Sequence, residues 1–214
     1  MRTRWLGRVA YEAAFALQEE IVARKIADAS AGDELLLLEH EPVFTIGRTP
    51  DQSSLGDETR LPHPVVKTNR GGQATYHGPG QLVGYPLIDL RRRGQDLHRY
   101  LRALEDSLIE LCASYGVGAQ RREGLTGVWV GERKLASIGV GVRRWVAMHG
   151  FALNVGGELA AFSRITPCGI AGVEMTSLAR ESGAPCAVED AAGRAAEFFA
   201  ERFDLLLPRL ERAA

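Results

Sequence analysis

Cysteine is scarce in this sequence of 214 residues, which contains only Cys112, Cys168 and Cys186. Their number is odd, they are widely spaced, and no two of them form a CxxC pair. These features argue against a disulfide framework and against a zinc site built on cysteine. Free thiols persist in reducing compartments, so we expect the protein to be cytoplasmic.

An excess of charge of either sign is also lacking. The sequence has 26 lysines and arginines against 27 acidic residues, which gives a formal net charge of -1. Such a chain is not drawn electrostatically to nucleic acid or to an anionic membrane. No apolar run approaches the length of a membrane span, and the N-terminus lacks the apolar core of an export signal. We therefore expect neither nucleic acid nor a membrane as a partner.

Hydrophobic periodicity predicts an α/β (α+β) fold. The hydrophobic content of 45% supports one sizeable core, so we expect residues 1–214 to form a single domain. Apolar residues at helical spacing predict helices over 11–29, 96–116, 176–180 and 188–203, the second with Asp96 as its N-cap. Cys112 lies beside the apolar stripe of that helix and is predicted to be a core residue, whereas Cys186 is predicted to be an incidental surface residue.

Short apolar runs predict the strands of a mixed, largely antiparallel central sheet flanked by helices. Residues 35–38 are typical of a strand buried on both faces, and extended segments are predicted over 43–46 and 65–68. Gly84 and Pro86 make 81–87 an edge or irregular strand. Segments 127–130, 134–142 and 145–155 predict an antiparallel meander. The polar stretch 48–63 is predicted to be a surface loop that acts as a mobile flap.

The densest functional signal is the segment 70–80, which reads RGGQATYHGPG. Its glycines allow the backbone to approach a ligand closely. A purely structural turn does not also need arginine, threonine, tyrosine and histidine, so we expect this segment to line a binding site. Its spacing is not that of a phosphate-binding P-loop.

A second signal is the run Thr166-Pro167-Cys168-Gly169, where a thiol stands between proline and glycine. The local pattern fits either an accessible nucleophile or a buried core cysteine. A nucleophilic thiol needs activation, because it is mostly protonated at neutral pH. The candidates are Lys134, His77 and His149. Lys134 is one of three lysines in an arginine-rich chain, and a desolvated lysine can act as a base whereas arginine stays protonated.

Six segments in a fixed order carry a family resemblance. They are 39–47 (EHEPVFTIG), 70–81 (RGGQATYHGPGQ), 127–134 (GVWVGERK), 137–139 (SIG), 149–154 (HGFALN) and 167–178 (PCGIAGVEMTSL). With these segments the chain resembles the octanoyl-carrier-protein:protein N-octanoyltransferases of lipoate biosynthesis, which are related in fold to lipoate and biotin protein ligases. The resemblance therefore implies a catalytic domain of that fold.

The resemblance also implies a role for individual residues. Cys168 would be the nucleophile that carries the acyl group as a thioester, and Lys134 would favour its thiolate form. The acyl pocket would be lined by Arg70, Gly71, Gly72, Gln73, Ala74, Thr75, Tyr76, His77, Ser137, Ile138, Gly139, Gly150, Phe151 and Ala152. Preorganised N–H groups stabilise an oxyanion, and we expect Gly71 and Gly72 to supply them. His77 would polarise the carbonyl or orient Lys134.

By the same resemblance, an octanoyl or lipoyl group passes from the phosphopantetheine of acyl carrier protein to Cys168, and then to the lysine of a lipoyl domain. The acceptors would be the lipoyl domains of 2-oxoacid dehydrogenase complexes and the glycine cleavage H protein, and the reaction would be the first step of endogenous protein lipoylation. Exchange between thioesters is nearly isoenergetic. We therefore expect no cofactor, neither ATP nor a metal ion.

Four other functions remain as alternatives. An ATP-dependent lipoate or biotin ligase would make an acyl-adenylate and would not depend on a cysteine. An amidotransferase would take the octanoyl group from a protein rather than from a carrier. A noncatalytic ligand-binding domain would form no covalent adduct, and a cysteine hydrolase would pair Cys168 with His77 or His149.

Overall fold

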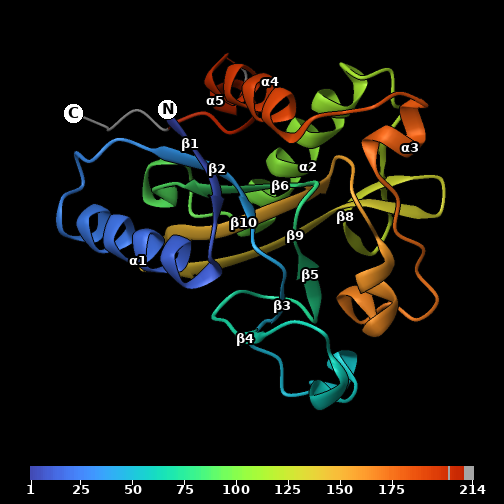
Figure 1. Ribbon diagram of the computed structural model, residues 1–214. Helices are drawn as coiled ribbons and strands as arrows, with labels where there is room; N and C mark the ends of the chain where they lie inside the picture. The colour runs from blue at the N-terminus through green and yellow to red at the C-terminus, as the bar shows by residue number, and fades with distance from the viewer. Residues whose placement is uncertain (202, 210–214) are drawn as a thin grey trace.

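A seven-stranded sheet runs through the centre of the molecule (Figure 1). The computed structural model describes residues 1–201 and 203–209. The strands are β1 (Arg2–Val9), β2 (Glu34–His40), β6 (Gln81–Leu87), β7 (Gln120–Arg122), β8 (Leu125–Val130), β9 (Arg133–Arg143) and β10 (Val146–Asn154). They stand in the order β1-β2-β6-β10-β9-β8-β7. β1 pairs with β2 in parallel and the other neighbours are antiparallel, which confirms the predicted mixed, largely antiparallel sheet.

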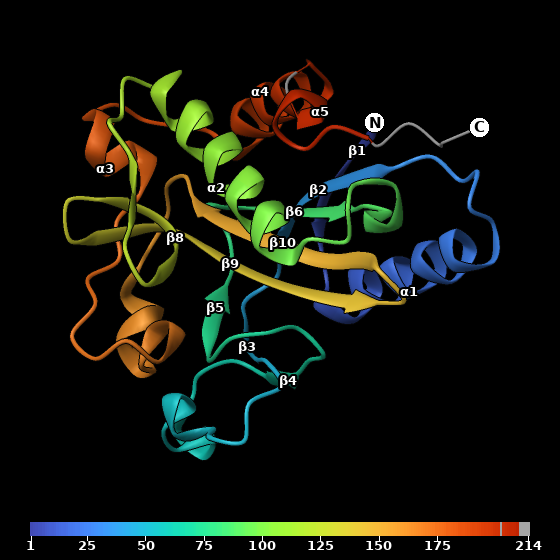
Figure 2. The ribbon, with the colours of Figure 1, turned by 180° about the vertical axis from the view of Figure 1, so that it is seen from behind.

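Helices cover both faces of this sheet (Figures 1 and 2). α1 (Tyr11–Ala27) packs on one face, against apolar side chains of β2, β6 and β10. α2 (Leu97–Ala113) and α4 (Val188–Glu201) pack on the other face, followed by the short α5 (Phe203–Leu206). The Asp96 side chain accepts the Arg99 N–H and caps α2, and Cys112 is fully buried, as predicted. The short helix predicted at 176–180 is α3 (Leu178–Ser182).

A smaller sheet of three strands lies below the central one in Figure 1. It consists of β4 (Val65–Lys67), β3 (Val43–Ile46) and β5 (Thr75–His77), in that order. β5 falls inside the glycine-rich segment 70–80, where we predicted no strand. Residues 75–77 form a strand, because they pair with β3 and are buried, whereas residues 78–80 form the turn that follows it.

The prediction of an edge or irregular strand at 81–87 is wrong, because β6 lies between β2 and β10, pairs with both, and has all of its residues buried. The glycine is there for packing: a Cβ at Gly84 would lie 2.1 Å from Cζ of Phe151. Strand β1 was not predicted at all. Its arginines mask the strand pattern, and charged residues of this kind are common on edge strands.

Loop 48–63 contains two single turns of 3-10 helix, at Ser53–Leu55 and Glu58–Arg60. Ser54 and Leu55 are buried although their neighbours are exposed. Leu55 packs in an apolar cluster with side chains of β3 and of the segment that precedes Cys168. The predicted surface loop is thus anchored at its centre, and its movement as a flap stays a prediction.

Candidate active site

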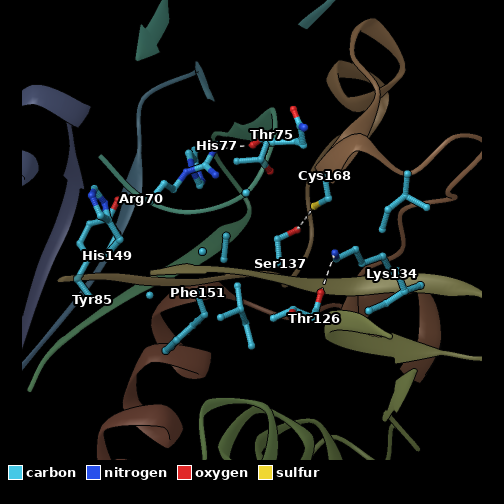
Figure 3. A pocket seen from close by; sticks show the side chains of 18 of the residues that line it. Arg70, Thr75, His77, Tyr85, Thr126, Lys134, Ser137, His149, Phe151 and Cys168 are labelled. Atoms are coloured by element: carbon cyan, nitrogen blue, oxygen red, sulfur yellow. Dashed lines mark hydrogen bonds between the residues drawn. The ribbon is translucent and has the colours of Figure 1, made fainter. Parts of the chain in front are cut away.

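A pocket of about 190 Å³ opens where the small sheet meets β9 and β10 (Figure 3). All of the predicted site residues line it except Gly71, Ala74 and Tyr76. Tyr76 turns its ring away, into the aromatic cluster with Phe44 and Phe162. The pocket also contains residues that the prediction missed: Tyr11, Tyr85, Gly124, Leu125, Thr126 and Ile170.

Cys168 sits in a single helical turn, Pro167–Gly169, with a left-handed backbone at φ +57° and ψ +15°. Its N–H donates to the Ala74 carbonyl at 2.8 Å, which fixes the turn against β5. The thiol is partly exposed, and its Sγ lies 3.5 Å from the Ser137 hydroxyl. Gly169 must lack a side chain, because a Cβ there would lie 2.7 Å from Cγ of Gln73. The local fold therefore presents the thiol to the pocket.

Lys134 is the first pocket residue of β9 and is only 2% exposed. Its Nζ donates to the Thr126 carbonyl at 3.1 Å and lies 5.0 Å from the centre of the Trp129 ring. Within the described residues it forms no ion pair with a carboxylate. Its backbone pairs with Glu174 and Thr176, so the chain that follows Cys168 returns alongside it. Figure 3 shows Lys134 and Cys168 at the same end of the pocket.

Arg70 is a buried cation on the side of the pocket. Its guanidinium donates to the Thr45 carbonyl and hydroxyl and to the Gln73 carbonyl, all at 2.9 to 3.0 Å. Burial lowers the pKa of Arg70, and no carboxylate pairs with it in the described part of the chain. The neighbouring Gly71 N–H donates to the Val140 carbonyl at 2.8 Å. The prediction that Gly71 supplies an oxyanion donor is therefore wrong, because its N–H already has a partner.

The two candidate histidines lie away from the thiol, toward the other end of the pocket (Figure 3). His77 bonds to Gln81 at 2.7 Å and to Thr45 at 3.4 Å, and His149 bonds to Asn69. Burial lowers the pKa of His149 to about 3 and keeps that of His77 well below its usual value. Both rings are therefore neutral. Neither histidine is hydrogen-bonded to Cys168, and His77 is not hydrogen-bonded to Lys134.

Comparison with known proteins identifies the family. Residues 10–200 match the family described as lipoyl protein ligase A/B catalytic domain. The chain belongs to this family. Within it, a protein of Geobacter metallireducens named octanoyltransferase is 53% identical over 213 residues, which is 100% of this chain and 98% of the relative. A second octanoyltransferase, from Geobacter sulfurreducens, is 55% identical over 91% of this chain and 81% of its own length.

The fold of the lipoyl protein ligase A/B family also appears in solved structures. The putative lipoate protein ligase Ta0514 from T. acidophilum superposes with a TM-score of 0.75, covering 94% of this chain and 85% of its own, at 14% identity. This likeness confirms the predicted fold. Among the described residues, no helix is long and apolar enough to cross a membrane, and no group of three or more histidine, cysteine or acidic side chains could hold a metal ion.

Proposed function

We propose that this protein is an octanoyltransferase, which transfers an octanoyl or lipoyl group from acyl carrier protein to the lysine of a lipoyl domain. The full-length relatives bear this name. The observation that carries the chemistry is a partly exposed thiol, Cys168, at the same end of one pocket as a buried lysine, Lys134, that has no carboxylate partner among the described residues. A thiol and an amine are the two groups that acyl transfer between a thioester and a lysine needs.

In the first half-reaction, the Cys168 thiolate attacks the carbonyl carbon of the carrier thioester. A new C–S bond forms to Cys168, and the bond to the phosphopantetheine sulfur breaks when the tetrahedral intermediate collapses. The ammonium of Lys134 donates a proton to the departing thiolate. The Ser137 hydroxyl, 3.5 Å from Sγ, can donate a hydrogen bond to the attacking thiolate.

In the second half-reaction, the amine of the acceptor lysine attacks the Cys168 thioester. The now neutral amine of Lys134 takes one proton from the attacking nitrogen as the C–N bond forms, and the Cys168 thiolate leaves. The enzyme thus returns to its starting state, with a thiolate beside an ammonium. Because Lys134 is buried beside the Trp129 ring and has no carboxylate partner within the described residues, its charge is not tied to another side chain.

The donor is already an activated thioester, so the proposed reaction consumes neither ATP nor a metal ion. The proposed acceptors are the lipoyl domains of 2-oxoacid dehydrogenase complexes and the glycine cleavage H protein, where the reaction would begin lipoylation. A nucleophilic thiol has to stay reduced, and for this reason we place the protein in the cytoplasm. The competing ATP-dependent ligase has the same fold but no need of Cys168.

The test is to incubate the protein with octanoyl-acyl carrier protein without ATP and to record intact masses. We expect a hydroxylamine-labile octanoyl adduct on the wild-type protein, none on Cys168→Ser, and formation slowed at least about a hundredfold on Lys134→Ala, since one general acid–base group contributes ~10²–10⁴-fold. Adding an apo lipoyl domain should then discharge the adduct.

The matched control is Cys186→Ser, which removes a partly exposed thiol that does not line the pocket. This variant should form the adduct at the wild-type rate. If no adduct forms on the wild-type protein and transfer appears only with ATP and free octanoate, the protein is a ligase and the proposal is wrong.

A further inference from the structure

Two pairs of neighbouring residues on β9 and β10 line one wall of the acyl pocket. Ala152 pairs with Ser137, and Gly150 pairs with Gly139. Because Sγ of Cys168 lies 3.5 Å from the Ser137 hydroxyl, an acyl carbonyl bound to the thiol starts beside the Ser137–Ala152 pair. Figure 3 shows that Tyr85 and His149 lie at the opposite end. An acyl chain therefore extends along β10 from Ala152 toward His149.

The ring of His149 closes this far end because its backbone is left-handed, with φ at +56°. In a regular strand, His149 would share the face of its partner Val140, which packs in the core beneath α2 and α4. Instead, a Cβ on Gly141 would lie 3.3 Å from Cδ2 of His149. Gly141 alternates with Val140 and so faces the side of the sheet that bears the pocket. The left-handed residue thus moves the ring across the sheet and into the path of the chain.

The ring is also fixed in place. It stacks on Phe15 of α1 at 5.6 Å with an interplanar angle of 15°, and its Nε2 bonds to the Asn69 side chain. The His149 N–H donates to Gln18 at 2.8 Å, and the residue is 1% exposed. An incoming chain cannot displace a ring packed in this way.

The distance from carbonyl to ring matches one chain length. Ala152 and His149 are three residues apart on β10, and a strand rises ~3.3 Å per residue, which gives about 10 Å. An extended octanoyl group has seven C–C bonds of ~1.5 Å in a zigzag and spans roughly 9 Å. We propose that His149 is the end wall of the acyl pocket and selects chains of about eight carbons. This inference rests on the proposed acyl transfer.

The end wall predicts an asymmetric chain-length profile. A chain shorter than octanoyl buries fewer methylenes. We expect its loading rate to fall about fourfold for each methylene that it lacks, because burial of one methylene contributes about 0.8 kcal/mol. Chains longer than octanoyl meet the fixed ring, so their loss is steeper than fourfold for each added methylene. A pocket without an end wall would instead favour longer chains progressively.

The experiment measures how fast Cys168 is loaded from hexanoyl-, octanoyl-, decanoyl- and dodecanoyl-acyl carrier protein, by intact mass. His149→Asn replaces the ring by a smaller side chain, and His149→Gly removes the side chain. Asparagine and glycine both tolerate a positive φ, so the backbone can keep its shape. We expect the decanoyl-to-octanoyl rate ratio to rise at least tenfold in both variants. The matched control is His98→Asn, the same substitution at an exposed histidine that does not line the pocket; its ratio should stay at the wild-type value.

The proposal is overturned if octanoyl still loads but the ratio is unchanged in both His149 variants, or if His98→Asn shifts it by the same factor. Thermal melts of each variant establish that the folded protein is being compared. If the wild-type protein loads no acyl group of any length, it is the proposed acyl transfer that fails, which separates the two conclusions.

Discussion

At the scale of single residues, the pocket depends on two positions with unusual backbone. Cys168 and His149 have φ values of +57° and +56°, which L-residues adopt at a cost of ~1–2 kcal/mol each. In each case the left-handed turn points a side chain into the pocket. From sequence, the proline and glycine beside Cys168 left an accessible and a buried thiol both open, and the structure shows a partly exposed one. Nothing beside His149 indicates its turn, because Met148 and Gly150 are compatible with a regular strand, so its place in the pocket could not be predicted.

The buried histidines predict how stability depends on pH. Burial lowers the pKa of His40 to about 4 and that of His149 to about 3. The unfolded chain binds protons on these rings below about pH 6.5, whereas the folded protein keeps them neutral to about pH 4. Stability is therefore complete above pH 6.5 and falls as the pH drops toward 4. We expect the melting temperature to fall by about 5 to 10 °C between pH 7.5 and pH 5.

Thermal melts of His40→Asn test this dependence against those of His98→Gln, which changes an exposed histidine. The His40 variant should be less stable at pH 7.5 and should lose less stability on going to pH 5. The His98 variant should follow the wild-type protein. An equal drop in His40→Asn and wild type would show that other groups cause the acid sensitivity.

At the scale of elements, loop 48–63 and the Cys168 turn are joined through one buried serine. The Ser54 hydroxyl donates to the Gln73 side chain at 2.9 Å and accepts the Ala74 N–H at 3.1 Å. The Ser54 carbonyl accepts the Thr166 N–H at 2.7 Å, and the Ala74 carbonyl accepts the Cys168 N–H at 2.8 Å. The turn that presents the thiol is therefore held from both sides by bonds that involve the loop.

We expect Ser54→Ala to lower kcat for acyl loading about tenfold with little change in KM for the carrier substrate. The substitution leaves the Ala74 N–H and the side-chain Oε1 of Gln73 without the Ser54 hydroxyl, at a cost of ~1–3 kcal/mol, and so loosens the turn, although Ser54 itself does not line the pocket. Steady-state kinetics check this. Ser54→Thr should recover part of the activity, and Ser53→Ala at the exposed neighbour should match wild type. A rise in KM alone would contradict a positioning role for Ser54.

Elements whose pattern is local were predictable, and elements defined by distant partners were not. The helix after Asp96 and the meander over 127–155 follow from periodicity and from short turns, which depend only on neighbouring residues. The central place of β6 depends instead on Phe151 filling the space above Gly84, which no local pattern reveals. The strand character of 75–77 likewise depends on pairing with β3.

At the scale of the whole molecule, Arg93 joins segments that are far apart in the chain. It is 1% exposed and pairs with Asp33 at 2.7 Å and with Asp204 at 2.8 Å, and it also donates to the Leu207 carbonyl. In sequence, Arg93 belongs to a run of three arginines that is typical of solvated surface. Its burial arises only because the end of the described chain folds back over the start of β2.

We expect Arg93→Met to lower the free energy of unfolding by about 3 kcal/mol, because it leaves the buried Asp33 carboxylate with less compensation. Urea denaturation measures the change. Arg180→Met is the matched control: its partner is Glu174 at 2.9 Å, and both side chains are more than half exposed, so a loss of at most ~1 kcal/mol is expected. Equal losses of unfolding free energy in the two variants would show that the buried ion pairs of Arg93 stabilise the fold no more than an exposed pair does.

The order of strands in the sheet has a consequence for how the chain folds. β6 pairs on one side with residues 34–38 and on the other with 151–154, so its second partner is synthesised long after it. Until then, a strand whose residues are all buried in the folded protein has an open edge on the nascent chain. Distant pairings of this kind slow folding and expose aggregation-prone surface. Production of this protein is therefore expected to depend on slow synthesis or on chaperones that shield the β6 edge until β10 emerges from the ribosome.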